Sequence, residues 1–161
     1  MADATTPRTG IGFAPEERAP TVSTRAARLK WVVIVDRDLP PGRAVNAAIC
    51  VAAATQSAVG GLLGDDVADA EGAVHPGLPW AGCSVLAADA AALRIARDKA
   101  AAYADTFVAD MPAAAQEARV YADYRAVVGK TAAEDLAYCA VSIVGPRNRV
   151  GKIAGKLPLL P

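Results

Sequence analysis

The chain has 161 residues, 53% of them hydrophobic, and its 17 basic and 17 acidic residues give a formal net charge of zero. A chain of this length forms one domain with a sizeable core, and a neutral chain has no overall field that attracts nucleic acid or an anionic membrane. No segment reaches the length of a membrane span, and the N-terminus lacks the apolar run of a secretion signal. We therefore expect a cytoplasmic protein with no membrane partner.

The first half of the chain predicts a tail followed by alternating elements. Residues 1–25 are rich in small, polar and proline residues, which favours a flexible N-terminal tail before an α/β domain at 26–161. The apolar run at 29–36 lacks alternation and is typical of a strand buried on both faces. A helix at 42–57, a long loop at 59–79 and a strand at 82–87 follow. Asp89 can cap a helix that reaches about residue 103.

The second half continues this alternation. A strand at 106–110 precedes a helix that starts at Pro112 and ends at Gly129. A helical turn at 131–134 and an apolar strand at 138–144 follow, and then Gly145-Pro146 and a basic turn or short helix. The pattern predicts an α/β fold with a single layered domain, in which a four-stranded, mixed and mostly parallel sheet is flanked by helices.

Polar side chains cluster where the first strand ends, and ligand sites in such sheets lie beyond the carboxyl ends of the strands. Asp36 and Asp38 would point the same way and repel each other in an extended strand, whereas Asp38 becomes a turn residue if the chain has already turned. Asn46 has poor helix propensity inside an alanine-rich helix, so it either makes a polar contact or faces solvent.

The cysteines and the acidic loop give no metal signal. Cys50, Cys83 and Cys139 fall in apolar stretches, so we expect buried thiols rather than disulfides or zinc ligands. The acidic residues at 65–71 do not fit a calcium loop. We predict no metal and no cofactor. His75 is the single histidine and lies in the same loop, where it either transfers protons or is an ordinary surface residue.

Basic residues are concentrated near the C-terminus, and one lysine stands at the first strand. The C-terminal group could hold a phosphate or form a solvated tail, and it consists of Arg147, Arg149, Lys152 and Lys156. Lys30 lies at the start of the first strand and could counter a carboxylate or simply be exposed.

Two segments resemble a known family. The stretch DLPPGRAVNAAICVAA resembles the first turn and helix of type 2 peptidyl-tRNA hydrolases, and VSIVGPRNRVGKIAGKLPLL resembles their closing segment. The chain resembles still more closely an uncharacterised bacterial family with that fold, a domain of unknown function. The residues that carry this resemblance are Lys30, Asp36, Asp38-Leu39-Pro40, Asn46-Ala47-Ala48, Gly64-Asp65, Asp69-Ala70, Gly72, His75-Pro76-Gly77, Asp110 and Gly145-Pro146. The resemblance implies a type 2 peptidyl-tRNA hydrolase-like fold.

The same resemblance aligns Asp110 with the active-site aspartate of the hydrolases. Its alternative role is to cap the helix that starts at Pro112. The hydrolases carry a glycine-lysine-glycine-lysine turn, a glutamine and a histidine at positions that are here Gly42, Arg43, Ala44, Val45, Ile49 and Ala52. Because the second lysine, the glutamine and the histidine are replaced, ordinary peptidyl-tRNA hydrolysis is disfavoured. An insertion at about 113–136 further changes the surface that would face tRNA.

We therefore predict a protein that binds or hydrolyses a small amide-, ester- or phosphate-bearing metabolite. Asp110 and His75 are the catalytic candidates, with the loop around His75 as a lid. The predicted substrate-binding residues are Asp36, Asp38, Arg43 and Asn46. Two alternatives remain: a peptidyl-tRNA hydrolase with Arg43 and the C-terminal basic residues on phosphates, and a non-catalytic protein whose alanine-rich helix faces form a homodimer.

Overall fold

Four strands form the central sheet of the computed structural model, which describes residues 10–19 and 21–161. Their order is β4 (Cys83–Ala88), β1 (Leu29–Asp36), β6 (Tyr138–Pro146) and β5 (Phe107–Pro112). β1 and β4 are parallel, whereas β6 runs antiparallel to both β1 and β5. The predicted mixed α/β sheet is confirmed. The expectation that it is mostly parallel is wrong, since one pair in this described sheet is parallel and two are antiparallel.

The connection between β5 and β6 explains the antiparallel pairing. It contains α3 (Ala114–Glu117), α4 (Tyr121–Val128) and the 3-10 turn η3 (Ala133–Asp135). Ala113 N–H donates to Ala137 O at 2.8 Å, so the connection leaves and re-enters the sheet at the same edge. A chain that returns at the edge it left must run antiparallel. The single helix predicted from Pro112 to residue 128 is also wrong, because β5 extends to Pro112 and extended backbone at Ala118 and Val120 separates α3 from α4.

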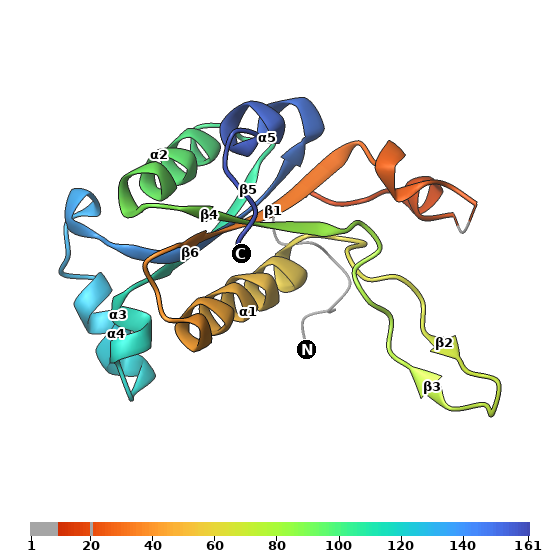
Figure 1. The fold of residues 1–161 in the computed structure, drawn as a ribbon, viewed down its shortest axis with the longest axis horizontal. Helices are drawn as coiled ribbons and strands as arrows, with labels where there is room; N and C mark the ends of the chain where they lie inside the picture. Colours follow the sequence, from red (N-terminus) through yellow and green to blue (C-terminus); the bar gives the residue numbers. More distant parts are fainter. Residues whose placement is uncertain (1–9, 20) are drawn as a thin grey trace.

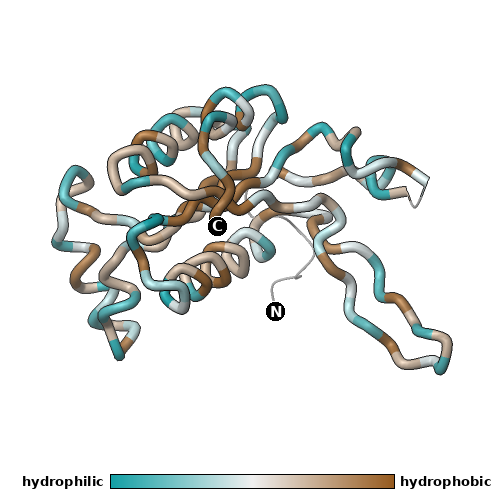
Figure 2. The backbone as a smooth tube through the Cα atoms, in the orientation of Figure 1, coloured by the Kyte–Doolittle hydropathy of each residue, from teal (hydrophilic) through white to brown (hydrophobic). Residues whose placement is uncertain are grey.

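Helices cover both faces of the sheet (Figure 1). α1 (Pro41–Ala58) packs on the face to which Trp31, Val33 and Val35 point. The opposite face is covered by α2 (Ala90–Ala101) and α5 (Arg147–Ala154). Figure 2 shows the strands as the most hydrophobic part of the molecule, at its centre. The prediction that the first strand is buried on both faces is confirmed, since residues 31–35 are all buried.

Local signals at the helix starts explain these boundaries. Pro41 occupies the first turn of α1, where a missing N–H leaves no hydrogen bond unmade. Asp89 Oδ1 accepts the Ala92 N–H at 2.8 Å, which confirms the predicted cap of α2. α5 begins directly after Gly145-Pro146. The start of α1 follows the carboxyl end of β1, and this turn places the first polar groups of the site.

A buried chain of hydrogen bonds fixes the far end of α1 to the sheet. Trp31 Nε1 donates to Ser142 Oγ at 2.8 Å, and the Ser142 and Thr55 hydroxyl oxygens are 2.6 Å apart. Thr55 Oγ1 donates to Val51 O, so Ser142 is the donor to Thr55. Thr55 and Ser142 are fully buried. Each side-chain polar group in this series of hydrogen bonds therefore has a partner.

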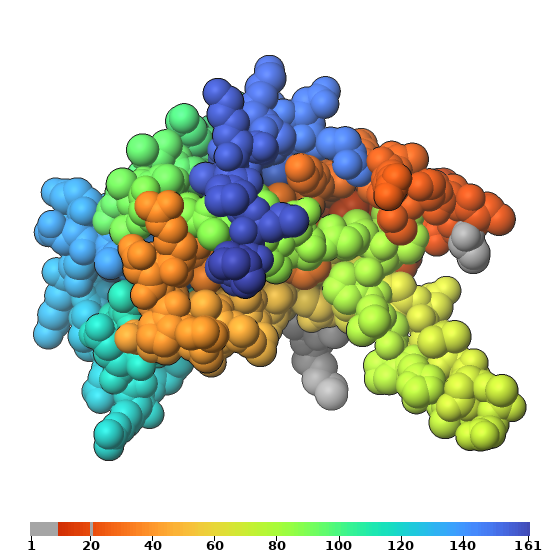
Figure 3. Space-filling model, viewed as in Figure 1, coloured from red at the N-terminus to blue at the C-terminus, as the bar shows by residue number. Residues whose placement is uncertain are grey.

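The predicted loop at 59–79 contains a small hairpin. β2 (Val67–Ala68) and β3 (Val74–His75) pair in antiparallel fashion, and the hairpin stands out from the body of the molecule (Figure 3). Gly77 lies where its missing side chain matters, because a Cβ there would be 1.9 Å from Gly64 O.

Part of the predicted tail packs on the domain. The described N-terminal residues include the 3-10 turns η1 (Pro15–Arg18) and η2 (Thr24–Ala26). Phe13 is 5% exposed, and its N–H donates to Gly60 O at 2.9 Å. The remainder of the predicted tail, residues 1–9 and residue 20, lies outside the described residues.

Candidate functional site

The carboxyl end of β1 turns sharply into α1. Asp36 Oδ1 accepts the N–H of Asp38 at 3.0 Å, which closes the turn. The structure therefore has Asp38 as a turn residue and not as part of an extended strand in which the two carboxylates point the same way. Arg37 Nη2 lies 3.3 Å from Asp89 Oδ2 in an exposed ion pair that links this turn to the start of α2.

Gln116 organises the polar groups of α1. Arg43 Nε donates to Gln116 Oε1 at 2.7 Å, while Gln116 Nε2 donates to Arg43 O at 2.8 Å and to Asn46 Oδ1 at 3.2 Å. The polar contact suggested for Asn46 is thus present, although Asn46 is also exposed. Sequence reasoning missed Gln116. Like Asn46, Gln116 is a polar side chain within an alanine-rich segment, and this pattern is the signal that points to it.

A β-bulge brings Cys139 to the same place. β5 pairs Met111 with Ala140 and Pro112 with Tyr138, so Cys139 is the extra residue of β6. Cys139 and Ala140 both join the core under α1, although successive strand residues ordinarily point to opposite faces. Cys139 Sγ lies 3.6 Å from Gln116 Oε1. A bulge leaves no sequence signal here, and Cys139 was predicted only as a buried thiol.

The charges around Cys139 favour a neutral thiol. Burial raises the pKa of Cys139, Asp36 and Glu117 raise it further, and Arg43 opposes them. A thiol with a raised pKa is a poor nucleophile at neutral pH. Gln116 Oε1 contacts both Arg43 and Cys139, so these three side chains meet beyond the carboxyl end of β1.

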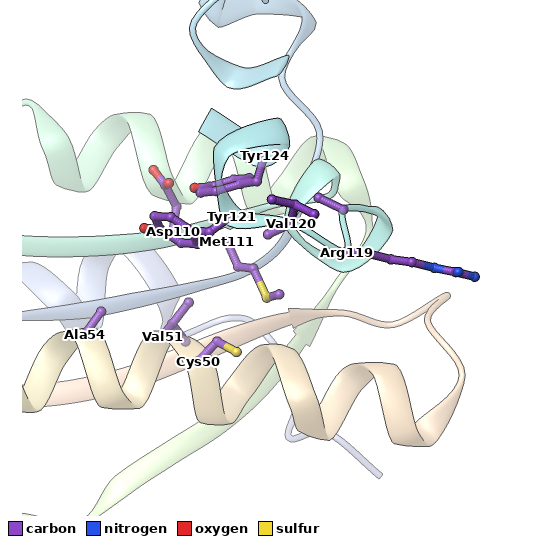
Figure 4. A pocket seen from close by; sticks show the side chains of 11 residues that line it. Cys50, Val51, Ala54, Asp110, Met111, Arg119, Val120, Tyr121 and Tyr124 are labelled. Carbon is purple, nitrogen blue, oxygen red and sulfur yellow. The ribbon is translucent and has the colours of Figure 1, made fainter. Parts of the chain in front are cut away.

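A cavity of about 480 Å³ has Ala115, the residue before Gln116, in its lining, whereas Arg43, Asn46 and Gln116 do not line it. Its walls come from α1, β5 and the segment from α3 to α4 (Figure 4). Cys50, one helical turn after Asn46, lines it and is exposed, whereas the sequence predicted a buried thiol. Tyr121 and Tyr124 form a tilted ring pair at 5.4 Å on the opposite wall. Val51, Ala54, Met111 and Ala115 supply apolar surface.

Asp110 borders this cavity but directs its carboxylate elsewhere. Asp110 Oδ2 lies 2.9 Å from Arg97 Nε of α2, on the side of the sheet away from α1. Although burial opposes its charge, the pKa of Arg97 is raised by its bonds to Asp110 and Asp98. The structure therefore does not bring the Asp110 carboxylate together with Asn46.

His75 lies in the projecting hairpin. Its Nε2 is 3.3 Å from Asp69 Oδ2, and the hairpin stands away from α3 and α4 (Figure 1). Asp69 also accepts the N–H groups of Glu71 and Ala73. Hydrogen bonds from Ala73, His75 and Glu71 lower the pKa of Asp69. His75 thus has a local partner within the hairpin.

Across residues 10–19 and 21–161, no three histidine, cysteine or acidic side chains come together as metal ligands. Within the same described ranges, every helix is too short or too polar to cross a membrane.

Comparison with known proteins identifies a family. No curated relative matches the chain. A solved structure of a protein of unknown function from Agrobacterium tumefaciens is similar, with a TM-score of 0.75 and 20% identity over 82% of this chain and 97% of that one. Residues 29–161 match the model of a family described as proteins of unknown function, DUF2000. Since this match spans most of the chain, the protein belongs to the DUF2000 family.

Proposed function

We propose that the protein binds a small metabolite with an apolar body and an amide, ester or phosphate head group in the cleft between α1 and the α3–α4 segment. The observation that carries this proposal is a cavity of about 480 Å³ whose lining includes Ala115, the residue before Gln116, which is hydrogen-bonded to Arg43 and Asn46. Small-molecule sites typically combine a cavity of this size with a few convergent polar groups.

The cavity supplies surface for the apolar body. Val51, Ala54 and Met111 form one side, and the Tyr121–Tyr124 pair forms the other. Burial against apolar and aromatic side chains contributes roughly 25 cal/mol per Å². Burial raises the pKa of the Tyr124 hydroxyl, and so do Tyr121 and Asp110, so that hydroxyl stays a neutral donor.

The polar groups supply recognition of the head group. Arg43 uses Nε to bond Gln116, which fixes the guanidinium and leaves its terminal nitrogens for a ligand. A fixed guanidinium donates two parallel hydrogen bonds to a carboxylate or phosphate. Gln116 holds Asn46 through its Oδ1, which leaves the Asn46 Nδ2 to donate to the carbonyl of an amide or ester.

Hydrolysis is a second candidate, because Asp110 lines the same cavity. To act as a base, its carboxylate would have to leave Arg97. The raised pKa of Cys139 argues against a thiolate mechanism. We therefore propose binding first and hydrolysis second. A type 2 peptidyl-tRNA hydrolase-like fold, peptidyl-tRNA hydrolysis and a homodimer remain predictions of the sequence.

Cys50 provides a direct test, because it is an exposed thiol on the cavity wall. Phenylphosphate, phenylacetate and phenylacetamide share a body and differ in head group. We expect at least one to slow alkylation of Cys50 by iodoacetamide, by about tenfold at a tenfold excess over its Kd.

Two substitutions on α1 make a matched pair for this experiment. Ala54→Leu fills the cavity, whereas Ala53→Leu makes the same change on the adjacent exposed position that does not line it. Protection should disappear in Ala54→Leu and persist in Ala53→Leu. If none of the three probes protects Cys50, or if both variants behave alike, the proposal is wrong.

A further inference from the structure

A second hollow lies at the other end of the sheet. It has a volume of about 260 Å³ and is lined by residues from η2, the starts of β1 and β4, and the start of α5, among them Thr24, Arg25, Lys30, Ser84 and Arg147. We call it the basic hollow. Lys30 and Asp36 are six residues apart on β1, about 20 Å at roughly 3.3 Å per residue, so it is distinct from the α1 cleft.

The basic hollow has three cationic side chains and no acidic one in its lining. Among the described residues, the ion pairs involve other cations, such as Arg28 with Glu17 and Arg149 with Asp105. Arg25, Lys30 and Arg147 form no ion pair with any described residue. The like charges around this hollow repel each other, and a bound anion would offset that repulsion because it attracts each of the three cations.

Arg147 is held in a position to bind such an anion. Its Nε donates to Ala27 O at 3.0 Å, and its backbone N–H donates to Arg28 O at 3.1 Å. The two terminal guanidinium nitrogens remain for a ligand and match the spacing of two phosphate oxygens. Lys30 is half-buried, which holds its charge near the wall. The hydroxyls of Thr24 and Ser84 add donors.

We propose that the basic hollow binds the phosphate group of a small phosphomonoester. Three cations match a dianion better than the single charge of a carboxylate or a phosphodiester. The volume of about 260 Å³ is below the usual range for drug-sized ligands, which fits a phosphate with a short substituent. This site does not depend on the function proposed for the α1 cleft.

Calorimetric titration at low salt tests the proposal with three probes. Glycerol 3-phosphate is the phosphomonoester, glycerate is its carboxylate counterpart, and a single-stranded RNA without terminal phosphates offers phosphodiesters. We expect glycerol 3-phosphate to bind with a Kd at least about tenfold below that of glycerate. Lys30→Gln should raise this Kd by about tenfold to a hundredfold, the range for one lost charge-assisted hydrogen bond.

Lys99→Gln on α2 removes the same charge outside the hollow and should leave the Kd unchanged. If Lys30→Gln does not fold, Arg25→Gln on the exposed turn η2 provides the same comparison. Equal affinity in Lys30→Gln and Lys99→Gln, or no binding at millimolar concentrations, would overturn the proposal. So would RNA binding tighter than that of glycerol 3-phosphate. Ala54→Leu should not alter phosphate binding, which separates this test from that of the α1 cleft.

Discussion

The buried hydrogen-bond chain between Trp31 and Thr55 makes a quantitative prediction about stability. Ser142→Ala removes the acceptor of the Trp31 N–H, which is held in the core with Trp31 5% exposed. A buried donor left without a partner costs about 1–3 kcal/mol. For a domain of this size that cost lowers Tm by roughly 2–4 °C per kcal/mol.

A double-mutant cycle separates this explanation from a general loss of packing. Thr55→Val removes the acceptor of the Ser142 hydroxyl, so it should cost about 1–3 kcal/mol in the natural background. In the Ser142→Ala background that hydroxyl no longer exists, so the same substitution should cost less than about 0.5 kcal/mol. The two effects should therefore be strongly non-additive.

Urea denaturation followed by circular dichroism gives the free energies of unfolding, and an unchanged m-value shows that only stability has changed. Two single effects whose sum equals the double effect within about 0.5 kcal/mol would refute the coupling between Ser142 and Thr55. If Ser142→Ala left the free energy of unfolding nearly unchanged, the substitution would not leave a buried indole N–H without a partner, and the explanation would be wrong.

Three further predictions concern the cleft and the hairpin. Cys50 should be alkylated before Cys83, because Cys50 is exposed and burial raises the pKa of Cys83 to about 12. Mass spectrometry of partly labelled protein measures the order, and equal labelling of the two cysteines would contradict this prediction. Gln116→Leu should change the free energy of unfolding by less than about 1 kcal/mol yet weaken probe binding about tenfold, and unaltered binding would remove Gln116 from the site. Hydrogen bonds lower the pKa of Asp69, so the stability it gives the hairpin should be complete above its ordinary pKa of 3.8 and be lost as pH falls below that value. Hairpin amide signals in NMR that do not change between neutral and acidic pH would contradict this.

Local patterns in the sequence predicted most elements to within about two residues. The apolar run of β1, the Asp89 cap and the Gly145-Pro146 turn each act over a few residues, so the sequence alone shows them. The direction of β6 contradicts the prediction of a mostly parallel sheet, because an apolar run reads the same for a strand of either direction. That direction depends on the connection at 113–137, whose ends meet at Ala113 and Ala137.

The residues of the candidate site also divide into those that local sequence predicts and those that depend on contacts between distant segments. Arg43 and Asn46 could be placed because both lie on a helix with a predictable start. Gln116 and Cys139 could not, since they reach the site through a broken helix and a bulge, which pair residues far apart in the sequence. Asp110 was singled out by the resemblance to the hydrolases, but its orientation depends on Arg97, a partner from another element.

The two walls of the α1 cleft differ in how firmly they are held. α1 buries five residues and is fixed to the sheet through Thr55, whereas α3 and α4 bury none of theirs. Segments with little buried apolar surface open locally at low free energy. The α3–α4 wall should therefore be the part that a ligand orders.

We expect hydrogen exchange at 114–128 to be fast in the free protein and to slow when a probe occupies the cleft, while exchange in α1 stays the same. Ala54→Leu should abolish this slowing and Ala53→Leu should not. Equal slowing in both helices would mean that the ligand stabilises the whole domain, and the α3–α4 segment would then have no special role as the adjustable wall.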